Sequence, residues 1–161
     1  MNPIIKDATL DDFDGIWPIF SAIIQEGDTF IYPEDFGVDN AKKRWMEGTK
    51  PYIVVIDNKI VGTYVIRPNK VGRGSHICNA GFMVHPDYRG QGIGRMMGEH
   101  ALKEAKDIGY QAMQYNVVAG TNVVSIKLWE SLGFKIIGTV PKAFNHKQKG
   151  LVDAHIMHRF L

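Results

Sequence analysis

The segment Arg89-Gly90-Gln91-Gly92-Ile93-Gly94-Arg95 constrains the fold of this chain more than any other. It follows an apolar run that stops at His85-Pro86-Asp87 and precedes a helix-like apolar stripe. Glycines at a turn from strand to helix let the backbone approach a ligand closely, and the free N–H groups of the first helical turn attract anions. With an arginine at each end, the segment predicts a phosphate or pyrophosphate site. The alternative is a tight turn whose glycines serve packing alone.

Two better-known nucleotide motifs do not fit this segment. A P-loop requires Gly, four residues and then Gly-Lys-Ser/Thr, which the sequence lacks. A dinucleotide fold requires the spacing G-x-G-x-x-G and an acidic residue about 20 positions further on. Here the spacing is G-x-G-x-G, and no Asp or Glu occurs between Ile108 and Trp129.

The first third of the chain is predicted to be mostly helical. After a short strand over residues 3–7, Thr9 and Asp12 have capping-box spacing, and apolar residues then recur at helical spacing. Pro18 falls within that pattern and should kink the helix or set a later start. A loop over 27–38 leads to a short helix from 39 or 40 to 47, with Trp45 facing inward. The helical apolar residues are Phe13, Ile16, Phe20, Ile23 and Ile24.

The remainder alternates strands with two helices. Runs at 52–56 and 60–66 flank Asp57-Asn58-Lys59, which is hairpin chemistry, and a polar connection spans 67–75. Further strands are expected at 76–84, 111–118, 134–140 and 151–160, the last two joined by a basic loop over 142–150. A helix is expected over 92–108 and ends at Gly109; its apolar stripe consists of Ile93, Met97, Ala101, Ala105 and Ile108. A second helix is capped by Thr121 or Asn122 and ends at Gly133; its apolar residues are Val124, Leu128 and Leu132.

This order of elements predicts an α+β (mixed α/β) domain, in which antiparallel hairpins and two helical crossovers share one sheet. A length of 161 residues favours a single domain over residues 1–161. Nineteen Lys and Arg against seventeen Asp and Glu are too balanced to predict a nucleic-acid or anionic-membrane partner.

Targeting, membrane and metal signals are also missing from the sequence. It has no signal-peptide pattern and no run of about 18 apolar residues. The single cysteine, Cys78, cannot form an internal disulfide, so a reducing compartment, the cytoplasm, is expected. His76 and Cys78 share a strand face without a third ligand, so no metal site is predicted.

Two segments resemble the signatures of the GNAT N-acetyltransferase family. Arg89, Gly92 and Gly94 match the family's acetyl-CoA signature Arg/Gln-x-x-Gly-x-Gly/Ala, and the similarity extends over residues 84–94. Downstream, the run from Asn122 through Leu128-Trp129-Glu130 to Leu132-Gly133-Phe134 resembles the second signature. The expected order of elements agrees along almost the whole chain. The chain is therefore identified as a member of this family.

The resemblance implies a splayed, mostly antiparallel central sheet flanked by helices, with the pantetheine arm of acetyl-CoA in the gap between two strands. The strand ending at Val84 would part from the strand around Tyr115. The N–H of Phe82 would hold the thioester carbonyl, which becomes an oxyanion during the reaction. The residues implied to bind acetyl-CoA are Phe82, Met83, Val84, Arg89, Gly90, Gln91, Gly92, Ile93, Gly94, Arg95, Asn122 and Trp129.

The implied activity is acetyl transfer from acetyl-CoA to the amine of a small molecule by direct attack in a ternary complex. A general base, often acting through water, and a donor to the CoA thiolate would assist. Trp129 stands where the family frequently carries a tyrosine acid, and an indole cannot release a proton near neutral pH. We expect Trp129 to cover the cofactor or pack on the sheet. Cys78, where some relatives carry a catalytic Glu, is expected to be a small buried hydrophobe.

The acceptor side is predicted from polar residues in unusual places. Asn79 and Asn116 lie in apolar strands, where an unsatisfied amide costs about 1–3 kcal/mol, so they face a polar cleft or are bonded across the sheet. With Phe82, these two are the predicted catalytic residues. The predicted substrate-binding residues are Glu26, Thr29, Phe30, Tyr32, Tyr64, Asn79 and Asn116.

Within the family, two features resemble branches that acetylate small amino-acid-like amines. Residues 139–143 with the strand asparagines are similar to the yeast proline-analogue acetyltransferases, and Glu26-Gly27-x-Thr29-Phe30 is also similar to the phosphinothricin type. A non-catalytic acetyl-CoA-binding regulatory module and a protein or peptide N-acetyltransferase remain alternatives. Homodimers are common in the family. The sequence leaves open the acceptor amine, the base and the oligomeric state.

Overall fold

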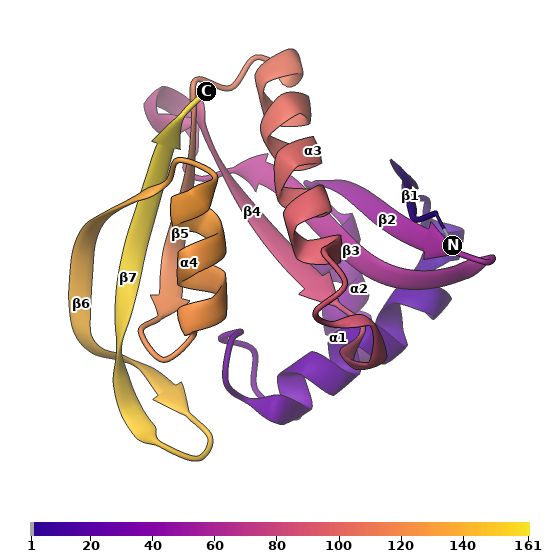
Figure 1. The fold of residues 1–161 in the computed structure, drawn as a ribbon, viewed down its shortest axis with the longest axis horizontal. Coiled ribbons are helices and arrows are strands. Elements are labelled where there is room, and N and C mark those ends of the chain that lie inside the picture. Colours follow the sequence, from indigo (N-terminus) through magenta and orange to yellow (C-terminus); the bar gives the residue numbers. More distant parts are fainter. Residues whose placement is uncertain (1) are drawn as a thin grey trace.

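The computed structural model describes residues 2–161 and shows a seven-stranded sheet covered by helices on both faces (Figure 1). The strands lie in the order β1-β2-β3-β4-β5-β7-β6, and only β4 and β5 are parallel. This is the predicted α+β class. The strands are β1 (Ile4–Asp7), β2 (Lys50–Ile56), β3 (Lys59–Pro68), β4 (Ile77–Val84), β5 (Ala112–Ala119), β6 (Lys135–His146) and β7 (Gly150–Phe160); the helices are α1 (Phe13–Glu26), α2 (Val38–Met46), α3 (Ile93–Ile108) and α4 (Val123–Ser131).

Two cores lie on opposite faces of the sheet. α1 and α2 pack on one face, which we call the α1 face, and bury residues such as Val65 of β3 and Met83 of β4. α3 and α4 pack on the other, the α3 face, and bury Tyr64 of β3 and Cys78 of β4. Because side chains alternate along a strand, each residue of β4 is assigned to one face by its position.

The local signals in the N-terminal half act as predicted. Thr9 and Asp12 form the capping box ahead of α1, with the Thr9 N–H donating to Asp12 Oδ2 at 2.7 Å. Asp57 and Asn58 have φ of 46° and 64° and form the two-residue hairpin between β2 and β3. Pro18 does not set a later helix start, because it lies on the exposed side of α1, where water can satisfy the carbonyl it leaves unpaired.

Three details of the C-terminal half differ from expectation. The predicted loop over 142–150 is mostly strand, since β6 continues to His146 through a bulge at which the Lys142 N–H bonds Asp153 Oδ1. Ile108, at the very end of α3, is 47% exposed. Val124 is 82% exposed, because residues four apart drift by about 40° around a helix of 3.6 residues per turn.

The feature that positions the site is the separation of β4 from β5. Their backbones pair only at Ile77 with Ala112 and Cys78 with Met113. One step further, the bond is made by a side chain: Asn79 Nδ2 donates to the Gln114 carbonyl at 3.0 Å. Beyond that point the two strands diverge (Figure 1), as the family resemblance implied.

Candidate active site

The glycine turn before α3 exposes several backbone N–H groups that have no hydrogen-bond acceptor in the part of the chain that the structure describes. Gly90 and Gly92 have φ of 74° and 81°, and a Cβ at either would meet no other atom within 4 Å. The first N–H to find a helical acceptor is that of Met96, which bonds the Gly92 carbonyl at 3.0 Å. The N–H groups of Ile93, Gly94 and Arg95 therefore point out of the end of a 16-residue helix, where the helix dipole is positive. This turn fits an anion.

The two arginines that flank the turn are held by side chains of other helices. Arg89 Nη2 lies 2.9 Å from Glu26 Oε2 at the end of α1. Arg95 Nη2 donates to Ser131 Oγ at 2.7 Å, at the end of α4. Both side chains are about half exposed and border the turn. Glu26, predicted to bind substrate, is instead the partner of Arg89, because α1 ends beside the glycine turn.

The free edge of β4 presents alternate residues to the gap. The His85 N–H bonds Val61 of β3 at 2.8 Å, and the Ile77 carbonyl accepts from Asn69 at 2.8 Å, so odd-numbered residues of β4 bond toward β3. The backbone groups of Phe82 and Val84 therefore face the gap. Met83 does not, since its backbone faces β3 and its side chain is buried on the α1 face. The prediction that Met83 binds the cofactor is wrong for this reason.

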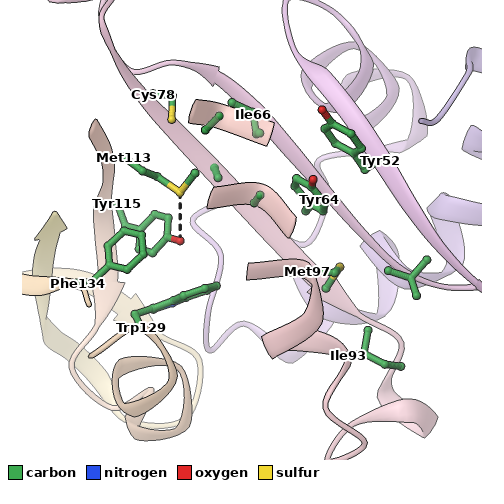
Figure 2. Packing of buried hydrophobic residues seen from close by; sticks show 14 of the residues in the cluster. Tyr52, Tyr64, Ile66, Cys78, Ile93, Met97, Met113, Tyr115, Trp129 and Phe134 are labelled. Atoms are coloured by element: carbon green, nitrogen blue, oxygen red, sulfur yellow. Dashed lines mark hydrogen bonds between the residues drawn. The ribbon is translucent and has the colours of Figure 1, made fainter. Parts of the chain in front are cut away.

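Aromatic rings close the gap on the α3 face. Trp129 of α4 is 7% exposed, and its ring centroid lies 4.8 Å from those of Phe82 and Tyr115. Figure 2 shows Trp129 and Tyr115 beside Phe134. The Tyr115 hydroxyl donates a hydrogen bond to Met113 Sδ at 3.5 Å. Burial raises the pKa of Tyr115 well above its usual value, so the Tyr115 hydroxyl keeps its proton at neutral pH and is a weak acid. Trp129 packs on the sheet, as predicted.

Cys78 is fully buried on the same face, and burial raises the pKa of its thiol from 9.0 to about 12. At pH 8 the thiolate fraction falls from about 10% to about 0.01%. We expect iodoacetamide to modify Cys78 in the native protein at least about 100-fold more slowly than in the urea-unfolded chain, as measured by intact mass. Equal rates in the two states would contradict the buried, unreactive role.

On the α1 face, the two predicted asparagines are linked by hydrogen bonds. Besides the bond from Asn79 to Gln114, the Gln114 amide donates to Asn116 Oδ1 at 3.1 Å, and Asn116 donates to Asn69 Oδ1 at 2.7 Å. Of the two alternatives, bonding across the sheet is therefore present. Asn79 Oδ1 has no hydrogen-bond partner within residues 2–161, so it remains available to a ligand.

The loop after α1 lies on the same face of the sheet as these hydrogen-bonded side chains. Phe30 and Tyr32 stack with ring centroids 6.0 Å apart, and a Cβ at Gly81 of β4 would lie 3.6 Å from the Phe30 ring. Thr29 precedes them and is half-buried. A pocket of about 460 Å³ opens between this loop and the β6–β7 hairpin. Its lining residues are Ile24, Gly27, Phe30, Ile31, Tyr32, Pro33, Glu34, Ala143, Phe144, Asn145, His146 and Lys147.

Tyr64 lies apart from these acceptor-side residues. It is fully buried on the α3 face, where its hydroxyl is 2.6 Å from His100 Nδ1 and its ring stacks on Tyr52 at 4.5 Å. The prediction that Tyr64 binds substrate is wrong, because the strand pleat turns it away from the loop after α1.

Sequence reasoning missed the contribution of the β6–β7 hairpin. Lys147 connects this hairpin to the loop after α1. The Lys147 N–H donates to the Gly27 carbonyl at 2.9 Å, and the Lys147 ammonium lies 2.6 Å from Glu34 Oε1. These contacts join residues 120 and 113 positions apart, so no local pattern could reveal them. Within residues 2–161 there is no cluster of three metal-ligating side chains and no helix long and apolar enough to cross a membrane.

A sheet divided between β4 and β5, with a helix N-terminus open at the division, is the arrangement of the acyl-CoA N-acyltransferase fold. The sequence profile of the acetyltransferase (GNAT) family matches residues 16–134, and the chain belongs to that family.

Individual relatives support the same placement. The N-acetyltransferase aca1 of Schizosaccharomyces pombe is 44% identical over 98 residues, which are 60% of this chain and 47% of that protein. The L-amino acid N-acyltransferase MnaT of Escherichia coli is 33% identical over 67 residues, 42% of this chain and 38% of that protein. The chain thus covers less than half the length of these curated relatives.

Solved structures match over nearly the whole chain. A GCN5-related N-acetyltransferase from Kribbella flavida has a TM-score of 0.94 at 37% identity, covering 99% of this chain and 98% of that one. A phosphinothricin acetyltransferase from Sinorhizobium meliloti, solved with acetyl-CoA, has a TM-score of 0.89 at 19% identity, covering 100% and 89%. At that identity the second match shows the fold alone.

Proposed function

We propose that this protein is an acetyl-CoA-dependent N-acetyltransferase that acts on the amine of a small molecule. The observation that carries the proposal is that unpaired N–H groups at the start of α3 adjoin the free edge of β4. Acetyl-CoA would supply the acetyl group as a thioester, so that a C–N bond to the acceptor forms while the C–S bond to CoA breaks.

This chain's donor-side residues fit such a ligand. The N–H groups of Ile93, Gly94 and Arg95 would bind the pyrophosphate, as helix N-termini bind phosphates generally. The Phe82 N–H, aimed into the gap, would donate to the acetyl carbonyl oxygen and stabilise the charge that develops there. Asn122 Oδ1 accepts a hydrogen bond from the Ser125 N–H at 3.3 Å and so caps α4. The amide NH₂ of Asn122 would remain free to contact the cofactor.

The acceptor would enter from the α1 face, through the pocket beside Phe30. Asn79 Oδ1 would accept a hydrogen bond from the acceptor amine at the mouth of the gap. His146 lines the pocket but does not serve as the base there, because its Nδ1 already accepts from the N–H groups of Gln148 and Lys149 at 3.1 and 3.2 Å.

An amino acid or a close analogue is the acceptor class we propose. Residues 139–143 and the loop at Glu26 resemble branches with such acceptors, and MnaT carries an amino acid in its name. A pocket of about 460 Å³ enclosed by a loop and a hairpin also suits a small molecule better than a folded protein.

Release of free CoA thiol tests the proposal directly. The purified protein would be incubated with acetyl-CoA and a panel of amino acids, polyamines and short peptides, with the acetylated product identified by mass spectrometry. We expect turnover with small amines. The replacement of the family's common tyrosine by Trp129 favours one competing function, a regulatory acetyl-CoA-binding module. Tight CoA binding without turnover of any amine would support that module and contradict the enzyme.

We also propose a single acetyltransferase domain over residues 1–161, a cytoplasmic location and a homodimer. The lone, buried thiol of Cys78 fits a reducing compartment. Ile136, Ile137 and Val140 are exposed on the edge strand β6, which suits a contact between copies. Light scattering of the purified protein distinguishes a dimer from a monomer.

A further inference from the structure

An arginine lies beside the proposed acceptor site without an acidic partner. Arg67 of β3 is paired in register with Asn79 of β4, so both side chains lie on the α1 face. The next pair on this face is Val65 with Gly81, and Val65 is fully buried. The Arg67 Nε is buried, and no hydrogen-bond acceptor reaches it within residues 2–161. A buried guanidinium donor without a partner is costly and points to a ligand that completes it.

The surroundings of Arg67 add positive charge rather than compensating it. Within residues 2–161, no carboxylate lies within 4 Å of Arg67 or Arg44. Arg44 of α2 donates instead to the Tyr32 hydroxyl at 3.1 Å. The pKa of Arg67 is lowered, mainly by burial and secondly by the positive charge of Arg44. Tyr32 raises the pKa of Arg67 and so acts in the opposite direction. Neither guanidinium group therefore has an anionic partner among the described residues, and a negatively charged ligand at Arg67 would be stabilised by both charges.

We propose that Arg67 binds the carboxylate of the acceptor, so that the substrate is a free α-amino acid and not a simple amine. The proposal rests on the acetyltransferase function proposed above. In an α-amino acid one carbon separates the carboxylate from the amine. Side chains paired across two antiparallel strands have Cβ atoms about 4.5–5.5 Å apart, so Arg67 and Asn79 project side by side from the α1 face. An acceptor held at Arg67 through its carboxylate would present its amine toward Asn79 Oδ1.

The chemistry of the guanidinium suits a carboxylate. A planar fork of donors matches a carboxylate in two parallel hydrogen bonds, which fixes orientation as well as position. A protein N-terminus carries no carboxylate one carbon from its amine. The same two residues therefore discriminate against peptide acceptors.

The test compares each amino acid with its carboxamide. CoA release would be measured for the twenty L-amino acids and their amides, with wild type, Arg67→Met and Arg73→Met. Arg73 is an exposed arginine in the connection that follows β3 and serves as the matched control. We expect wild type to prefer the best acid over its amide by at least about 100-fold in kcat/KM. Arg67→Met should lower kcat/KM for the acid by about 100-fold, mainly through KM, with the amide rate and CoA affinity unchanged.

Three results would overturn the inference. If the wild-type protein uses acids and amides equally well, it does not recognise the carboxylate. This comparison uses the wild-type protein alone, so it does not depend on whether a variant folds. If Arg67→Met lowers both rates equally while Arg73→Met does not, Arg67 has a structural role. Each of these leaves the acetyltransferase function intact. If no amine of any kind releases CoA, the proposed function fails and the inference fails with it.

Discussion

Replacing Gly92 by valine is expected to abolish CoA binding while the chain stays folded. Gly92 has φ of 81°, a conformation that costs an L-residue about 1–2 kcal/mol and a β-branched one more. A Cβ there meets no protein atom within 4 Å, so it projects into the space in front of α3. That space is where the N–H groups of Ile93, Gly94 and Arg95 would hold the pyrophosphate. The side chain therefore occupies the ligand's place and also strains the turn that presents the donors.

Isothermal titration with CoA measures this effect, and we expect the dissociation constant to rise at least about 100-fold. Gly48→Val is the matched control, because Gly48 has φ of 65°, has equally open surroundings and follows α2, outside the glycine turn. It carries the same backbone strain without the steric conflict and should bind CoA as wild type does. Wild-type affinity in Gly92→Val would show that the pyrophosphate does not bind at this turn.

The parts of the fold that the sequence predicted depend on contacts between near neighbours. The capping box of Thr9 with Asp12 and the hairpin at Asp57-Asn58 each involve residues within three positions of one another. The glycine turn is of the same kind, since its open donors follow from glycine and helix geometry within seven residues. The separation of β4 from β5 was predicted only through the family resemblance, because nothing local indicates where two strands stop pairing.

The errors at the candidate site arose from contacts between distant residues. Tyr64 and Met83 lie at the right positions along their strands to be near the predicted ligands. The pleat of the strand turns each side chain to the opposite face from its predicted ligand. No pattern in the sequence indicates which face of the sheet binds which ligand. Glu26 was placed near the acceptor by its loop, whereas Arg89, 63 residues away, is its partner. Arg67 was overlooked because one arginine at the end of an apolar strand is ordinary. It becomes informative only when its Nε is seen to lack a partner.

Removal of the Trp129 side chain is expected to cause a large loss of stability, because the indole is 7% exposed. The indole lies between Phe82, Tyr115 and Phe134, and α3 approaches it at Gly98, where an added Cβ would lie 2.9 Å from the Trp129 ring. Trp129→Ala would leave a large cavity between α4 and the divided sheet, at a cost of about 3–5 kcal/mol in the free energy of unfolding. Trp17→Ala removes a half-buried indole from α1 and should cost less. Urea titration followed by circular dichroism gives both values.

Trp129→Phe separates this packing role from proton donation to the CoA thiolate. Phenylalanine keeps much of the ring contact, so the loss of stability should be about 1–2 kcal/mol, small enough for the enzyme to remain folded for assay. Indole does not titrate near neutral pH, so the pH dependence of kcat/KM should keep its shape in the variant. A change in that shape, or loss of kcat with wild-type CoA affinity and stability, would assign Trp129 a role in the chemistry. An unchanged profile would show that Trp129 does not protonate the CoA thiolate.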